Sequence, residues 1–308
     1  MSEVASRRVR AAVTSLVLGF LIFLAKTVAY LRTGSSAILS DALESIVNVV
    51  AAAFAVYAVR FAAQPADRDH PYGHGKMEYL SAAFEGGLVG FAALTIVYSA
   101  IRALMAPPEL HALDQGMIIA GLAAVANLLL GLWLLRIGKA SSSPTLIADG
   151  HHVLSDVWTT AGAIVGVGIV RLTGLTWIDP VVAILLALLL LRTALKLVLS
   201  SANGLMDRED PELLQRLVDA FNATEVEGIG GVHHLRAIRS GDVVHVDAHV
   251  YVPHHWTVGR AHAAAHQLEA SVKEKSGLNG EIALHFDTAA DDWVRRAVSL
   301  EEATRGPQ

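Results

Sequence analysis

The sequence has no cysteine, so it can form neither disulfide bonds nor metal sites with thiolate ligands. Any bound metal must therefore be held by histidine, carboxylate or amide groups. Charged residues are also scarce, at 17% of the 308 residues, whereas 53% are hydrophobic. This composition is too apolar for an ordinary soluble domain and predicts a polytopic membrane protein with some soluble mass. The formal net charge of -5 gives no electrostatic support for a nucleic-acid partner, and none is expected.

Six apolar segments each approach the roughly 20 residues that an α-helix needs to cross a lipid bilayer. They cover about 11–31, 37–61, 79–105, 117–135, 147–172 and 179–199. Arginine and lysine gather before the first segment and in the connections 62–78 and 136–144, which predicts that these parts face the cytoplasm. An even number of spans then places both termini there. Lys26 interrupts the first segment, and we expect its long side chain to reach back to the membrane surface.

The composition changes after residue 201, where polar residues become frequent and the hydrophobic period shortens. We predict a transmembrane domain over 1–203, a cytoplasmic α+β domain over 204–292 and a loose tail over 293–308. Within the α+β domain we expect helices at 211–223 and 258–275, and strands at 232–238, 243–252 and 282–286.

Two pairs of polar residues stand at a spacing of four within apolar segments, Glu44 with Asn48 and His152 with Asp156. Residues at this spacing share one face of a helix. Ionisable groups in a membrane span mark an ion or proton path by default. The two pairs together supply four ligands and two carboxylates, enough to balance a divalent cation, although hydrogen bonds that only join the helices are an alternative. We interpret Asp41 and Asp149, one turn before each pair, as groups that support these ligands or line the ion path.

Two further groups of candidate ligands lie outside the spans. Asp67, His70 and His74 fall in the polar connection 62–78, which could equally be a solvated loop. The cytoplasmic domain carries a larger set with the histidine and carboxylate mixture that suits zinc and neighbouring transition metals. Its members are His233, His234, His245, Asp247, His249, His262, His266, His285 and Asp287. Glu85, early in the third span, is interpreted as a carboxylate at the membrane interface.

These residues occur within motifs that resemble those of the cation diffusion facilitators, proton-coupled efflux transporters for divalent transition metals. The similarity is greatest to the bacterial ferrous-iron and zinc efflux branch and extends over most of the chain. The motifs are GSSAILSDAL at 34–43, QPAD at 64–67, HPYGHGKME at 70–78, ADGHHVLSD at 148–156, GVHHLR at 231–236 and LHFD at 284–287.

The resemblance implies six transmembrane helices, a ferredoxin-like, metallochaperone-like cytoplasmic domain, a homodimer in the cell (inner) membrane, and protons as counter-substrate. It implies a transport site at Glu44, Asn48, His152 and Asp156 and a loop site at Asp67, His70 and His74. It also implies a binuclear cytoplasmic site at His233, His249, His262, His285 and Asp287, for which we expect Zn²⁺. Lys76 and Asp207 would form a charge pair where the two domains meet.

The chain departs from the family pattern in one place, because members usually have Asp or His at the position of Glu44 and Asp at that of Asn48. One imidazole with three oxygen donors favours the harder ions Mn²⁺ and Fe²⁺, while Zn²⁺, Co²⁺ and Ni²⁺ stay open. We therefore expect a proton-coupled exporter of divalent transition metals. The alternatives are a metal sensor or scaffold that does not transport, and a membrane-embedded metalloenzyme that uses the same ligands.

Overall fold

The computed structural model describes residues 3–33, 36–105, 114–175, 177–241, 243–289 and 297–304. By its internal contacts the chain divides into two compact units, Met1–Leu205 and Met206–Gln308. The two units are described separately below.

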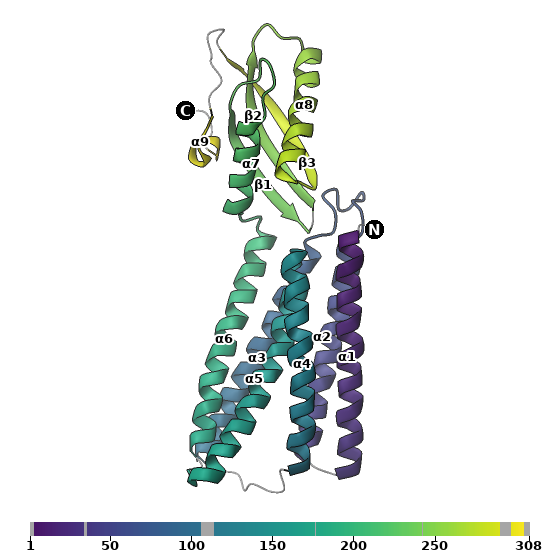
Figure 1. Cartoon of the computed structure of the whole chain (residues 1–308), viewed down its shortest axis with the longest axis vertical. Coiled ribbons are helices and arrows are strands. Elements are labelled where there is room, and N and C mark those ends of the chain that lie inside the picture. The colour runs from purple at the N-terminus through teal and green to yellow at the C-terminus, as the bar shows by residue number, and fades with distance from the viewer. Residues whose placement is uncertain are drawn as a thin grey trace. The chain divides into compact units, whose positions relative to one another are not determined.

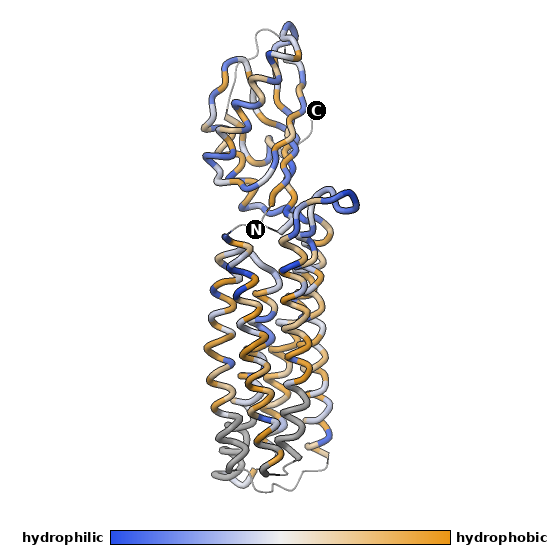
Figure 2. The backbone as a smooth tube through the Cα atoms, turned by 90° about the vertical axis from the view of Figure 1, so that its right-hand side faces the viewer, coloured by the Kyte–Doolittle hydropathy of each residue, from blue (hydrophilic) through white to orange (hydrophobic). Residues whose placement is uncertain are grey.

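The described part of the first unit is a bundle of six long helices (Figure 1). Five of them are long and apolar enough over their described residues to cross a membrane, and α5, of similar length, packs among α3, α4 and α6. Figure 2 shows hydrophobic residues along most of the bundle. The helices are α1 (Glu3–Thr33), α2 (Ser36–Ala62), α3 (Met77–Met105), α4 (Asp114–Ala140), α5 (Pro144–Thr173) and α6 (Ile178–Leu205). The predicted six-helix membrane domain is confirmed.

Small side chains fill the contacts between these helices, and large apolar side chains face outwards. Ala55, Ala93 and Ala187 are fully buried, whereas Phe91 and Leu129 are 71% and 66% exposed. This arrangement is typical of membrane proteins, because lipid accepts large apolar groups and small residues let helices approach closely. Glycine has this role between α4 and α5, where a Cβ atom on Gly150 would lie only 2.9 Å from the side chain of Leu135.

A buried polar network joins two helices and one interhelical connection near the N-terminal end of α1. The Arg8 guanidinium donates to Glu78 Oε1 at 2.8 Å and also to the carbonyl oxygen of Ser141. The second carboxylate oxygen of Glu78 accepts a hydrogen bond from the Ser143 hydroxyl. Arg8 and Glu78 are 4% and 1% exposed, so both charges are shielded from water and depend on each other for compensation. The network ties the starts of α1 and α3 to the connection between α4 and α5.

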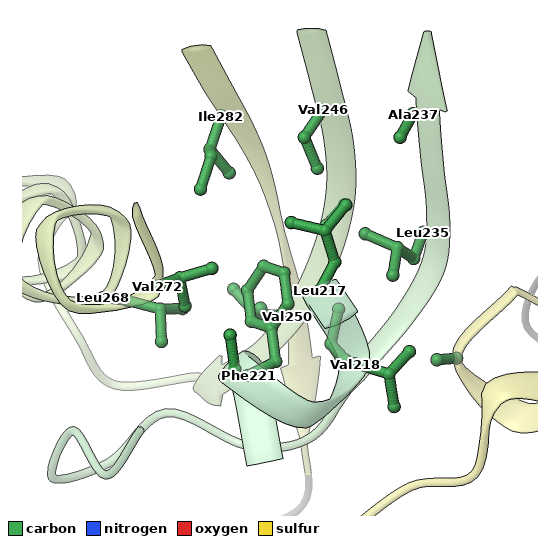
Figure 3. Packing of buried hydrophobic residues seen from close by; sticks show 14 of the residues in the cluster. Leu217, Val218, Phe221, Leu235, Ala237, Val246, Val250, Leu268, Val272 and Ile282 are labelled. Carbon is green, nitrogen blue, oxygen red and sulfur yellow. The ribbon is translucent and has the colours of Figure 1, made fainter. Parts of the chain in front are cut away.

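In its described part, the second unit is a two-layer α+β domain. The strands β1 (Val232–Ser240), β2 (Val243–Pro253) and β3 (Gly280–Ala289) lie in that order, with β1 antiparallel and β3 parallel to β2. Helices α7 (Pro211–Ala223) and α8 (Val258–Ser276) cover one face of the sheet, and their apolar side chains meet those of the strands there (Figure 3). Leu217, Leu235 and Val272 are fully buried in this core. The predicted α+β class is confirmed.

The end of the chain differs from the prediction of a loose tail. A short helix, α9 (Leu300–Thr304), adds the fully buried Ala303 to the core of this domain. The Asn222 amide donates to the Val298 carbonyl oxygen at 2.8 Å and accepts from the Val298 backbone N–H at 3.0 Å. The prediction is wrong for the described part of the tail, because this pair of hydrogen bonds and one small apolar residue hold it against the domain.

Candidate metal transport site

Asn48 on α2 joins His152 and Asp156 on α5. Its amide nitrogen donates to Asp156 Oδ2 at 2.5 Å, and its amide oxygen lies 3.0 Å from His152 Nε2. Three of the four predicted transport ligands are therefore brought together from two helices that are far apart in the sequence. The side chains of residues 36–44, which include Asp41 and Glu44, lie outside the described residues, so those two assignments stay predictions.

The hydroxyl groups beside this cluster donate hydrogen bonds to backbone carbonyl oxygens of their own helix. Ser155 Oγ donates to the His152 carbonyl oxygen at 2.6 Å, and Thr159 Oγ1 donates to the Asp156 carbonyl oxygen at 3.0 Å. His152 is only 5% exposed. Because Asn48 offers a carbonyl oxygen to Nε2 of the ring, the hydrogen bond requires a proton on that nitrogen. A metal that binds at Nε2 must displace this proton.

Asn48, His152 and Asp156 line two cavities at once. The larger, of about 710 Å³, extends between α2, α3, α5 and α6 past Thr95, Ser99 and Pro180, away from the end of the bundle that carries the N-terminus. The smaller, of about 30 Å³, lies between α1, α2, α4 and α5 and has room for about one or two water molecules. The cluster thus lies between a wide cavity and a small polar chamber.

The small chamber contains groups whose position the sequence did not reveal. Lys26 and Asn127 line it together with Asp149, which accepts a hydrogen bond from Ser15. Lys26 is only 7% exposed, so the expectation that its side chain reaches back to the membrane surface is wrong. Its helix is turned so that the ammonium group faces the interior of the bundle. Asp149 lines the same chamber as His152, and its role as a supporting or pathway group stays a prediction.

The connection between α2 and α3 brings Asp67, His70 and His74 together, with ligand atoms within 4.8 Å of one another. Asp67 Oδ1 lies 3.2 Å from His70 Nδ1, and its Oδ2 lies 3.2 Å from His74 Nε2. The backbone N–H of His70 donates to the same carboxylate at 2.7 Å and lowers the pKa of Asp67. The turn therefore favours the charged form of Asp67, which is the form that binds a cation.

In the cytoplasmic domain three histidines form a row across the sheet. His233 pairs with His249 in the β1–β2 register, and His249 pairs with His285 in the β2–β3 register. Asp287 closes the group, with Oδ2 at 2.9 Å from His233 Nε2 and 3.0 Å from His249 Nδ1. His285 Nε2 is 3.7 Å from the other oxygen. Burial disfavours the ionised carboxylate, but the hydrogen bonds from His249 and His233 outweigh it, and the pKa of Asp287 is lowered.

A bulge in β1 explains why His233 belongs to this row. The register shifts between His233 and Arg236, and His234 has a φ of 52° within it. Val232 and Leu235 both remain in the core, so the extra residue leaves His233 on the opposite face of the sheet. The two adjacent histidines in the sequence gave no indication of this bulge, because a regular strand would also separate them to opposite faces.

His262 does not join this row within the described chain. It lies on α8, which covers the core face, whereas His249 and Asp287 alternate with core residues and so occupy the other face. The ring of His262 contacts His266 instead, with 3.1 Å between the two Nε2 atoms. Its predicted place in the cytoplasmic site stays a prediction, as does the pair of Lys76 with Asp207, whose members belong to different units.

Comparison with known proteins identifies transport proteins of similar sequence. A model of the cation efflux transmembrane domain matches residues 12–206, and a model of the cytoplasmic domain of cation efflux proteins matches residues 210–289. An uncharacterized transporter, sll1263 of Synechocystis sp., is 38% identical over 267 residues, which are 85% of this chain and 84% of the relative. The cation-efflux pump FieF of Pectobacterium atrosepticum is 29% identical over 277 residues, 90% and 91% of the two chains.

The matched regions cover the bundle with its Asn48, His152 and Asp156 cluster and the sheet with its row of histidines. Both family models describe cation efflux proteins and both relatives are described as a transporter or a pump, so the metalloenzyme alternative is wrong. The chain is therefore a membrane transporter, not an enzyme, and belongs to the cation diffusion facilitator family of cation efflux proteins.

Proposed function

We propose that the protein exports a divalent transition-metal cation from the cytoplasm in exchange for protons. The observation that carries this proposal is the position of Asn48, His152 and Asp156, which lie between two cavities inside an apolar bundle. Glu44 completes the ligand set as predicted from its spacing to Asn48. One imidazole, one amide and two carboxylates neutralise a divalent cation and bind it without a thiolate.

The same groups account for the coupling to protons. In the metal-free form, Asn48 holds His152 through the protonated Nε2 atom and holds Asp156 through its amide nitrogen. A metal that enters binds Nε2 of the neutral His152 ring, whose single proton moves to Nδ1, and turns the Asn48 amide oxygen towards itself. On the far side of the membrane a second proton binds the ring and releases the metal, and this proton leaves to the cytoplasm when the site faces it again. The bundle alternates between two states, which metal and protons stabilise differently.

The cytoplasmic domain serves dimerisation. The ligand set that the resemblance implies includes His262, which lies on the opposite face of its own domain from His249 and Asp287, so a second copy of the chain supplies it. Zn²⁺ is the metal that suits this set of imidazoles and carboxylate best. The protein is a homodimer in the cell (inner) membrane with both termini in the cytoplasm, divided into a membrane domain over 1–203, a cytoplasmic domain over 204–292 and a tail.

The proposal is tested with purified protein in proteoliposomes. Metal entry and internal pH are recorded together for Zn²⁺, Fe²⁺, Mn²⁺ and Co²⁺, with wild type beside the Glu44→Asp/Asn48→Asp variant. We expect each transported metal to move protons in the opposite direction, and the variant to shift preference from Mn²⁺ or Fe²⁺ towards Zn²⁺. Metal binding by wild type with no flux of any metal would instead support a sensor or scaffold built on the cytoplasmic histidines.

A further inference from the structure

Glu85 on α3 is a buried carboxyl group that the transport site does not use. It is fully buried, and neither of its oxygen atoms has a hydrogen-bond partner among the described residues. The interpretation of Glu85 as an interface carboxylate is therefore wrong. An ionised carboxylate without a partner is strongly disfavoured in such surroundings, so the group is a neutral carboxylic acid in this conformation.

The position of Glu85 connects it with the transport site through Asp149. The Asp149 carboxyl group is near enough to influence Glu85 electrostatically, and the His152 ring influences Asp149 in the same way. Glu85 and His152 each lie eight residues from the start of their helices, α3 and α5, which begin at the same end of the bundle. Both residues therefore lie about 12 Å along the helix axis from that end of their helices. Asp149 also lines the small chamber beside His152, so one residue adjoins both this chamber and Glu85.

The other charged groups on the helices around α3 leave Glu85 without a cation. Arg60 on α2 and both Arg192 and Lys196 on α6 are exposed. His151 on α5 is half-buried and interacts electrostatically with Lys139 and Lys196. The side chains of Asp41 and Glu44 on α2 lie outside the described residues. Among the described groups, Asp149 is thus the charge that acts on Glu85, and its sign opposes ionisation.

We propose that Glu85 is a proton-binding site of the transport cycle, separate from the metal ligands. Glu85 keeps its proton while the Arg8–Glu78 network holds this half of the bundle packed. It takes this proton up by way of Asp149 while the transport site faces the far side, and releases it to the cytoplasm when that half opens and water reaches the contact between α3 and α5. Metal entry from the cytoplasm requires the same opening, so one additional proton moves against each metal. This inference rests on the proposed exchange of metal for protons.

The test compares wild type with Glu85→Gln, which keeps the shape of the protonated group but cannot lose a proton. Proteoliposomes carry a metal dye and a pH dye, and the number of protons moved per Zn²⁺ is measured between pH 6 and 8. We expect Glu85→Gln to move about one proton fewer per metal, and its transport rate to depend less steeply on pH. Glu85→Asp retains the wild-type ratio, and Glu212→Gln on the exposed first turn of α7 is the matched control.

The proposal is overturned if Glu85→Gln keeps the wild-type proton ratio and pH profile. Absence of metal flux in wild type would instead refute the proposed exchange, and this inference with it. If Glu85→Gln does not fold, infrared spectra of wild type with ¹³C-labelled glutamate decide the question. A carbonyl band of a protonated glutamate that weakens when metal is added supports the proposal, and a band that metal leaves unchanged contradicts it.

Discussion

Replacing Asn48 with aspartate tests how the transport site balances charge. In the wild-type protein the Asn48 amide nitrogen lies 2.5 Å from Asp156 Oδ2 and donates a hydrogen bond to it. The variant Asn48→Asp places a second carboxylate oxygen at this distance. Two carboxylates so close cannot both be ionised without a cation between them, so we expect the pair to share one proton in the metal-free state.

The expected magnitude follows from this extra proton and extra charge. A divalent cation must displace the shared proton, so the affinity of the variant should change about tenfold more per pH unit than that of wild type. At high pH, where the proton no longer competes, a charged ligand replaces a neutral one. An interaction of this kind contributes about 1.5–3 kcal/mol, which corresponds to roughly 10–150-fold tighter binding.

The assay is isothermal titration calorimetry of Zn²⁺ and Mn²⁺ at two pH values, each in two buffers of different ionisation enthalpy, which counts the protons released. The two proteins compared differ only at position 48, and both also carry Asp67→Ala and Asp287→Ala. The loop and cytoplasmic clusters then do not contribute to the measured binding. An unchanged proton count together with unchanged affinity would refute the reasoning, because it would mean that position 48 is not a ligand.

Three further predictions follow from buried or paired charges. Glu78→Gln should lower the free energy of unfolding by about 3–5 kcal/mol, because it leaves Arg8 buried without its counter-charge. The double variant Arg8→Leu/Glu78→Leu should lower the free energy of unfolding by less, because it leaves no buried charge. Thermal unfolding in detergent, followed by tryptophan fluorescence, compares the two variants. Lys26→Met should tighten metal binding about tenfold by removing a cation from the chamber, and calorimetry of the variant with unchanged affinity would contradict this. Because the pKa of Asp287 is lowered in the folded state, its ionised carboxylate stabilises the folded domain at pH values above about 3.9, the pKa of an unfolded aspartate. This contribution is lost as the pH falls through the lower pKa of the folded state. Circular dichroism of Asp287→Asn below about pH 4 should therefore show a weaker dependence of stability on pH than wild type.

Local signals in the sequence predicted the helices and the spacing of ligands within each of them. The bounds of α7 were predicted to the residue, because Asp210 accepts from the backbone N–H groups of Glu212 and Leu213 and Pro211 begins the helix. The pair of His152 and Asp156 was visible because four residues make about one turn of a helix. These features depend only on residues close together in the chain.

Features that depend on how elements pack could not be predicted in this way. The inward direction of Lys26 and the complete burial of Glu85 follow from the rotation of α1 and α3 against their neighbours. The row of His233, His249 and His285 depends on the strand register and on the bulge in β1. β3 is longer than predicted because its parallel pairing with β2 extends from Gly280 to Ala289.

The most direct test of the account is the proton flux that a metal gradient drives through Asp156→Ala in proteoliposomes. Wild type and Asp219→Ala, a change on the exposed side of α7, serve as references in the same lipid and at the same protein density. We predict that Zn²⁺ or Mn²⁺ gradients move protons through both references and that Asp156→Ala, correctly folded by size-exclusion chromatography, moves none. Wild-type flux through Asp156→Ala would contradict the assignment of the transport site.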